Sequence, residues 1–188
     1  MQIAGSMFRV DNVQALPQTF FCRLPASWGW GTWQRAWTRF EPDARKLYGQ
    51  LAARSAFWEF DIKGSYDYSG MLRQQAEGIV DSWAVRWYAS MFMLDGLCLR
   101  PTRSLVHNIG FDGTGVHCGV TDAFDVEIAD APVRSFPAAI AESGPVVDAI
   151  AAFFRSLDRR GIRSLAIRAK SWLQRLGRRA VGSHRALR

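Results

Sequence analysis

The sequence has no run that approaches the ~18 consecutive apolar residues needed to span a bilayer. Its first residues lack the basic region and long apolar stretch of a secretory signal. It has three cysteines, Cys22, Cys98 and Cys118, which is an odd number at wide spacings. Such a set is unlike a disulfide framework or a zinc site and favours a reducing compartment. We therefore expect a cytoplasmic protein.

Nucleotide-binding loops are also missing from the sequence. Neither the G-x-G-x-x-G pattern nor a P-loop occurs, so no phosphate-binding loop follows a long apolar strand. The composition is globular, with 48% hydrophobic and 22% charged residues in 188, which excludes a disordered or low-complexity chain. The length suits one domain, or one domain with an appendage.

Positive charge is concentrated at the C-terminal end. Of the 24 basic and 17 acidic residues, eleven basic and one acidic residue lie in 155–188. The rest of the chain therefore holds thirteen basic and sixteen acidic residues and is net acidic. A basic tail favours an anionic partner, and a net acidic body argues against nucleic acid.

The basic tail also carries an apolar stripe at helical spacing. The stripe consists of Ile162, Leu165, Ala166, Ala169, Trp172, Leu173 and Leu176. The pattern predicts a helix over about 162–176, with arginines on its other face. Residues 162–179 then either lie on an anionic membrane surface, at the inner face of the cytoplasmic membrane, or pack their stripe against the body.

Short strands and longer helices are mixed along the rest of the chain. Apolar runs predict strands at 2–4, 6–10, 20–22, 97–99, 104–107 and 126–128. Periodicity, capping residues and breakers predict helices that begin near residues 30, 42, 69, 81 and 143, the last of them ending near residue 160. The expected fold class is α/β, rich in helix, with short mixed strands.

Tryptophan is unusually abundant, with eight in the chain, and four of them lie in the segment 28–37. Trp30, Trp33 and Trp37 are spaced as on one face of a helix, and we interpret Trp33 and Trp37 as core residues. Trp28 and Trp30 flank Gly29, which permits a tight turn. One of these two indoles can then face a ligand, because aromatic rings stack on flat faces such as those of sugars.

Two other places in the sequence carry candidate chemistry. Asp81 precedes a predicted helix, where it either caps the helix or acts as a general base beside Trp83. The glycine-rich segment 108–119 holds Asp112 and His117, with His107 just before it. Carboxylate and imidazole can bind a divalent cation, but the spacing matches no metal motif, and a structural loop is the alternative.

Three segments together resemble a bacterial subgroup of family 2 glycosyltransferases. They are S-W-G-W-G-T-W-Q-R-A-W at 27–37, D-S-W-A-V-R-W at 81–87 and S-L-V-H-N-I-G-F-D-G-T-G-V-H-C at 104–118. The resemblance implies the GT-A fold, a nucleotide-sugar donor and a divalent metal ion, Mn²⁺ or Mg²⁺. The family's D-x-D motif has no counterpart in the sequence. The chain therefore looks like the C-terminal, acceptor-side half of such an enzyme over 1–130, followed by a basic helical tail over 131–188.

The resemblance also implies roles for individual residues. Asp81 would be the general base that takes a proton from the hydroxyl of a saccharide or lipid-linked acceptor. Trp28, Trp30 and Trp83 would line the acceptor site, and His117 or Asp112 would contact the metal. Without a donor half the chain would be inactive alone. The alternative is a non-enzymatic module that binds carbohydrate or a membrane surface.

Overall fold

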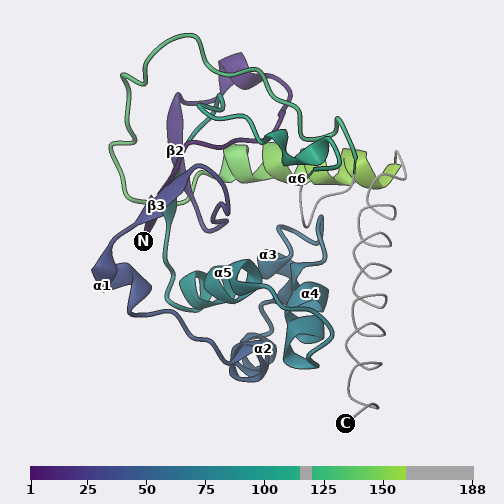
Figure 1. The fold of residues 1–188 in the computed structure, drawn as a ribbon. Coiled ribbons are helices and arrows are strands. Elements are labelled where there is room, and N and C mark those ends of the chain that lie inside the picture. Colours follow the sequence, from purple (N-terminus) through teal and green to yellow (C-terminus); the bar gives the residue numbers. More distant parts are fainter. Residues whose placement is uncertain (115–119, 160–188) are drawn as a thin grey trace. The chain divides into compact units, whose positions relative to one another are not determined.

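The structure is a computed structural model, and it describes residues 1–114 and 120–159 (Figure 1). The predicted tail helix at 162–176, the membrane-binding segment 162–179 and His117 lie outside the described residues. The elements in chain order are β1 (Gln2–Ala4), η1 (Val13–Ala15), β2 (Thr19–Cys22), β3 (Trp30–Thr32), α1 (Gln34–Trp37), α2 (Ala44–Ala53), α3 (Phe57–Phe60), α4 (Tyr68–Ala76), α5 (Trp83–Met93), β4 (Cys98–Pro101), η2 (Ile109–Phe111) and α6 (Gly144–Arg159).

Spatial contacts divide the chain into two units. The first unit contains Met1–His107 and Val126–Arg155, and the described residues of the second are 108–114, 120–125 and 156–159. All four strands and the helices α1 to α5 belong to the first unit. The sequence-based division at residue 130 stays a prediction.

The four strands form one small mixed sheet in the order β2-β4-β1-β3. β1 is parallel to β4 and antiparallel to β3, and β2 is antiparallel to β4. The predicted α/β class with short mixed strands is therefore confirmed, and strands were correctly expected near 2–4, 20–22 and 97–99. The segments 6–10, 104–107 and 126–128 form no strand in the described structure.

The tryptophan-rich segment differs from its predicted helix. Trp30 lies in β3, Trp33 is the residue before α1, and Trp37 ends this four-residue helix. The i, i+3, i+7 spacing gave the wrong period because 30–32 pairs with β1, with Ala4 opposite Trp30. Tertiary pairing outweighs local periodicity where the segment is this short.

Helix α5 begins and ends in a manner close to that expected from sequence. Ser82 is its N-cap and makes no capping bond with its side chain, so the interpretation of Asp81 as the cap is wrong. At the other end Asp95, with φ of 51°, has the left-handed conformation. A Cβ atom at the following Gly96 would lie 2.3 Å from Sδ of Met1 and 3.0 Å from the carbonyl oxygen of Met91.

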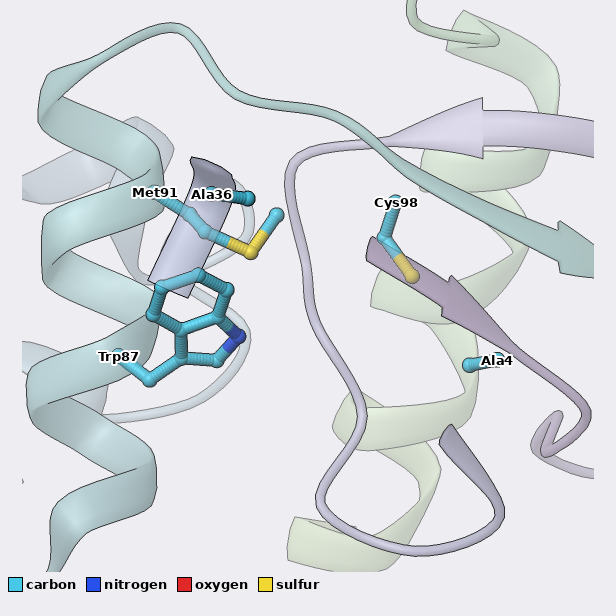
Figure 2. Close-up of a cluster of buried hydrophobic side chains, with 5 residues drawn as sticks. All are labelled: Ala4, Ala36, Trp87, Met91 and Cys98. Atoms are coloured by element: carbon cyan, nitrogen blue, oxygen red, sulfur yellow. The ribbon is translucent and has the colours of Figure 1, made fainter. Parts of the chain in front are cut away.

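The centre of the first unit is a contact between α5 and the sheet. Figure 2 shows Trp87 and Met91 of α5 together with Ala36, and Ala4 and Cys98 on the neighbouring strands β1 and β4. All five side chains are buried, and Trp87 retains 1% of its exposure. Residues 87 and 91 lie one turn apart on the same face of α5, so both side chains can enter the same buried cluster.

We predict that Trp87→Ala destabilises the protein by about 3–5 kcal/mol, because it removes a fully buried indole and leaves a cavity. Trp58→Ala is the matched control, because Trp58 is 56% exposed; its expected cost is within ~0.5 kcal/mol. Urea unfolding followed by circular dichroism measures both. Equal losses in the two variants would contradict the placement of Trp87 in the core.

Two cysteines face each other across the sheet. Cys22 of β2 is in register with Cys98 of β4, and both are free thiols in the core. Burial raises the pKa of the Cys22 thiol to about 11 and that of Cys98 to about 12. Both side chains therefore remain protonated thiols near neutral pH and are poor nucleophiles.

This burial predicts a loss of stability at alkaline pH. The unfolded thiols release their protons above pH 9.0, the ordinary value, whereas the folded protein keeps them to about 11 and 12. The free energy of unfolding should therefore fall as the pH rises through this interval.

In a Cys118→Ser background, Ellman's reagent should label Cys22 and Cys98 only when urea unfolds the chain. Rapid labelling of the folded protein would contradict this burial.

In the described part of the chain, no helix is both long and apolar enough to cross a membrane.

Candidate functional site

Five aromatic side chains from three elements form one cluster, which we call the aromatic cluster. Its members are Trp30 of β3, Trp37 of α1, Phe40 of the following turn, and Trp83 and Trp87 of α5. The ring of Trp30 stacks on that of Trp83, with centroids 5.4 Å apart. The rings of Trp37 and Phe40 are stacked at 5.1 Å. Such offset pairs stabilise a cluster beyond the burial of their area.

The aromatic cluster has a buried side and an exposed side. Trp87 is buried against the sheet, whereas Trp37 is 41% exposed and Trp83 is 40% exposed. The interpretation of Trp37 as a core residue is therefore wrong, and Trp33 is also exposed, at 45%. Trp37 and Trp83 contact each other edge to face, with centroids 6.4 Å apart. Two adjoining and partly exposed indoles present apolar surface that a flat ligand can cover.

Asp81 directly precedes Ser82, the N-cap residue of α5. Its carboxylate is 91% exposed and accepts a hydrogen bond from Nη2 of Arg86 at 3.0 Å. Arg86 follows Trp83 by three positions, so the two side chains lie on neighbouring parts of one helix face. Its guanidinium lies over the ring of Phe40, 6.0 Å from the centroid. Asp81, Arg86 and the aromatic cluster therefore form one continuous group, in which Arg86 connects the other two.

The third segment of the family resemblance approaches the first at one glycine. Gly29 has φ of 55°, and a Cβ atom there would lie 2.6 Å from the side chain of Val106. Its carbonyl accepts a hydrogen bond from the amide of Gly5 at 2.7 Å. Trp28, just before this turn, is partly buried, and its place in a ligand site stays a prediction.

Asp112 lies in the second unit, in a local turn. Its Oδ1 accepts hydrogen bonds from the hydroxyl and the backbone amide of Thr114, at 2.7 and 2.8 Å. These bonds lower the pKa of the Asp112 carboxyl. Within residues 1–114 and 120–159, no group of three His, Cys, Asp or Glu side chains could hold a metal ion.

A cavity of about 140 Å³ lies elsewhere in the first unit, between β2, α3, α5 and α6. Its walls include Leu24, Tyr88, Phe92 and Ile150, with Arg23 among the polar groups. Arg23 is engaged by Glu142 and by the ring of Phe92. None of the predicted site residues lines this cavity, so it does not bear on them.

Asp81, Trp30 and Trp83 of the candidate site are predicted from the sequence, whereas Trp37, Arg86 and Phe40 join it only through the structure. Trp37 was assigned to the core because its spacing fits a buried stripe. Arg86 received no role, although an acid five residues before a base, across the start of a helix, is a readable signal for a pair. Phe40, which joins the two groups, has no such signal in the sequence.

Comparison with protein-family models, with curated proteins and with solved structures returns no match.

We predict that Gly29→Ala destabilises the fold by about 2–4 kcal/mol, because it combines a strained φ with a clash. Gly78→Ala is the matched control, since Gly78 has φ of 72° but nothing within 4 Å of the new Cβ atom; we expect about 1 kcal/mol from strain alone. Chemical unfolding of both variants measures the difference. Equal losses in the free energy of unfolding would show that the contact with Val106 does not destabilise the Gly29→Ala variant.

Proposed function

We propose that the first unit is the acceptor-binding part of a GT-A-type glycosyltransferase and that the acceptor is a saccharide. The sugar ring lies on the exposed indoles of Trp37 and Trp83, and Asp81 is the general base. The observation that carries the proposal is that Arg86 pairs with the exposed carboxylate of Asp81 and also lies over the ring of Phe40, a member of the aromatic cluster. The two segments of the resemblance that supply these groups meet where Trp30 stacks on Trp83.

The chemistry follows from the groups at this place. A pyranose presents an apolar C–H face to the indoles and hydroxyls at its rim. Asp81 withdraws the proton of one hydroxyl as its oxygen attacks the anomeric carbon of the donor sugar, and the nucleoside diphosphate departs. A base needs to come within about 3 Å of that proton, and the exposure of Asp81 leaves room for this approach. The donor and the Mn²⁺ or Mg²⁺ ion belong to the donor half that the resemblance implies.

A non-enzymatic carbohydrate-binding module is the second candidate. The indoles and the Asp81–Arg86 pair all belong to one unit of the chain, so binding a saccharide does not depend on a donor half. The two candidates share the site and differ only in whether transfer follows binding. The membrane-surface alternative concerns 162–179, outside the described residues, and stays a prediction.

The first test is saccharide binding by the full chain. We expect neutral mono- and disaccharides to change the tryptophan fluorescence saturably, and saturation-transfer NMR to report contact with the ring C–H groups. Trp83→Ala and Trp37→Ala should each weaken binding about tenfold, the effect of losing one stacked ring. Trp58→Ala, which removes an exposed indole from another surface, should leave the affinity unchanged.

Transfer is tested separately with UDP-, GDP- and dTDP-sugars, Mn²⁺ and the bound saccharide, in the presence of a donor-half chain. Asp81→Asn should retain binding and lose transfer by 10²-fold or more, the usual contribution of a general base. Binding without transfer under all conditions would favour the module. A folded chain that binds no saccharide would overturn both candidates.

A further inference from the structure

The candidate site holds one negative and one positive side chain, Asp81 and Arg86, which form an ion pair. This pairing affects which saccharides the site can bind. Resting on the proposed function, we propose that the site selects neutral saccharides and excludes acidic ones, because Asp81 occupies the guanidinium of Arg86. An arginine beside an aromatic platform would otherwise bind the carboxylate of a uronate or a phosphorylated sugar.

Arg86 is held from several directions. Its Nε donates to the carbonyl of Ser82 at 3.3 Å, and its Nη1 donates to the carbonyl of Pro42 at 3.5 Å. The ring of Phe40 lies beneath it. The Arg86 side chain keeps only 21% of its exposure, whereas that of Asp81 keeps 91%. The guanidinium is therefore held by the protein, and the carboxylate is the more exposed member of the pair.

The neighbouring charges do not replace Asp81 as a partner for Arg86. Glu41 forms its ion pair with Lys46, and Asp43 accepts the first amides of α2. In the described structure the only carboxylate paired with Arg86 is that of Asp81. Removing the charge at position 81 therefore leaves a fixed cation, with one unopposed positive charge, at the edge of the aromatic cluster.

An acidic sugar meets two obstacles at this site. Its carboxylate is repelled by Asp81, and it must displace Asp81 to reach Arg86. A neutral sugar meets neither obstacle, because its hydroxyls donate to the exposed carboxylate of Asp81 and it does not need to reach Arg86. Specificity for neutral sugars thus comes from a repulsive group as much as from an attractive one.

The experiment compares methyl β-D-glucoside with methyl β-D-glucuronide, two sugars that differ at the sixth carbon alone. The full chain and its Asp81→Asn variant are titrated with each sugar by calorimetry and by saturation-transfer NMR. We expect the wild type to bind the glucoside about tenfold more tightly. In Asp81→Asn the affinity for the glucuronide should rise about tenfold, the effect of one charge-assisted hydrogen bond.

Four further measurements identify the cause of this gain in affinity for the glucuronide. High salt should reduce the gain, because it screens the new ion pair. The double variant Asp81→Asn/Arg86→Gln should lose the gain, since it has no cation to offer. Glu41→Gln, which removes a carboxylate that is paired with Lys46 and not with Arg86, should not raise the affinity for the glucuronide. Asp81→Ser should reproduce the effect of Asp81→Asn.

Each remaining outcome decides against the proposal. A wild type that binds both sugars equally, or an Asp81→Asn variant that binds the glucoside without a gain for the glucuronide, overturns the selectivity and leaves the saccharide site intact. Failure of both natively folded proteins to bind either sugar, with circular dichroism as the check on folding, overturns the saccharide site itself.

Discussion

The packing of Trp87 against the sheet fixes the position of everything else in the candidate site. Trp87 belongs to one buried cluster with Ala4 and Cys98 of the strands and Ala36 of α1, whose small side chains leave room for an indole. Burying this ring stabilises the helix–sheet contact by several kcal/mol. Once residue 87 is anchored, Trp83 must lie one turn earlier on the same helix face, at the edge of the buried region.

The position of α5 also places the charged residues of the proposed site, which lie at the start of this helix. Since Ser82 is the N-cap and makes no capping bond with its side chain, the backbone amides do not recruit Asp81. Its carboxylate instead turns to Arg86, three positions beyond Trp83, and remains open to solvent. Helix α5 and the two residues before it thus supply Trp83, Arg86 and Asp81 to the proposed site, and α1 supplies Trp37.

The tryptophan segment shows why a periodic pattern misleads in a small mixed sheet. Three tryptophans at helical spacing suggested one buried face, yet Trp30 is in a strand, Trp37 is half-exposed at the end of a short helix, and Trp33 contacts the guanidinium of Arg35. A helix of four residues gains too little from its own hydrogen bonds to impose its period on the neighbouring residues. Pairing with β1 therefore decided the conformation at 30–32, and the cluster formed across elements instead of along one.

The sequence by itself determined the α/β class, the central strands, the long helices α5 and α6, and the presence of Asp81 and Trp83 near one another. These features depend on local patterns of apolar residues and helix breakers, which tertiary contacts reinforce. Only the tertiary structure decided which indoles are buried and which are exposed, that Phe40 connects Arg86 to Trp37, and that Gly29 packs against Val106. These contacts join residues far apart in the chain or in different elements, and no local pattern encodes their distances.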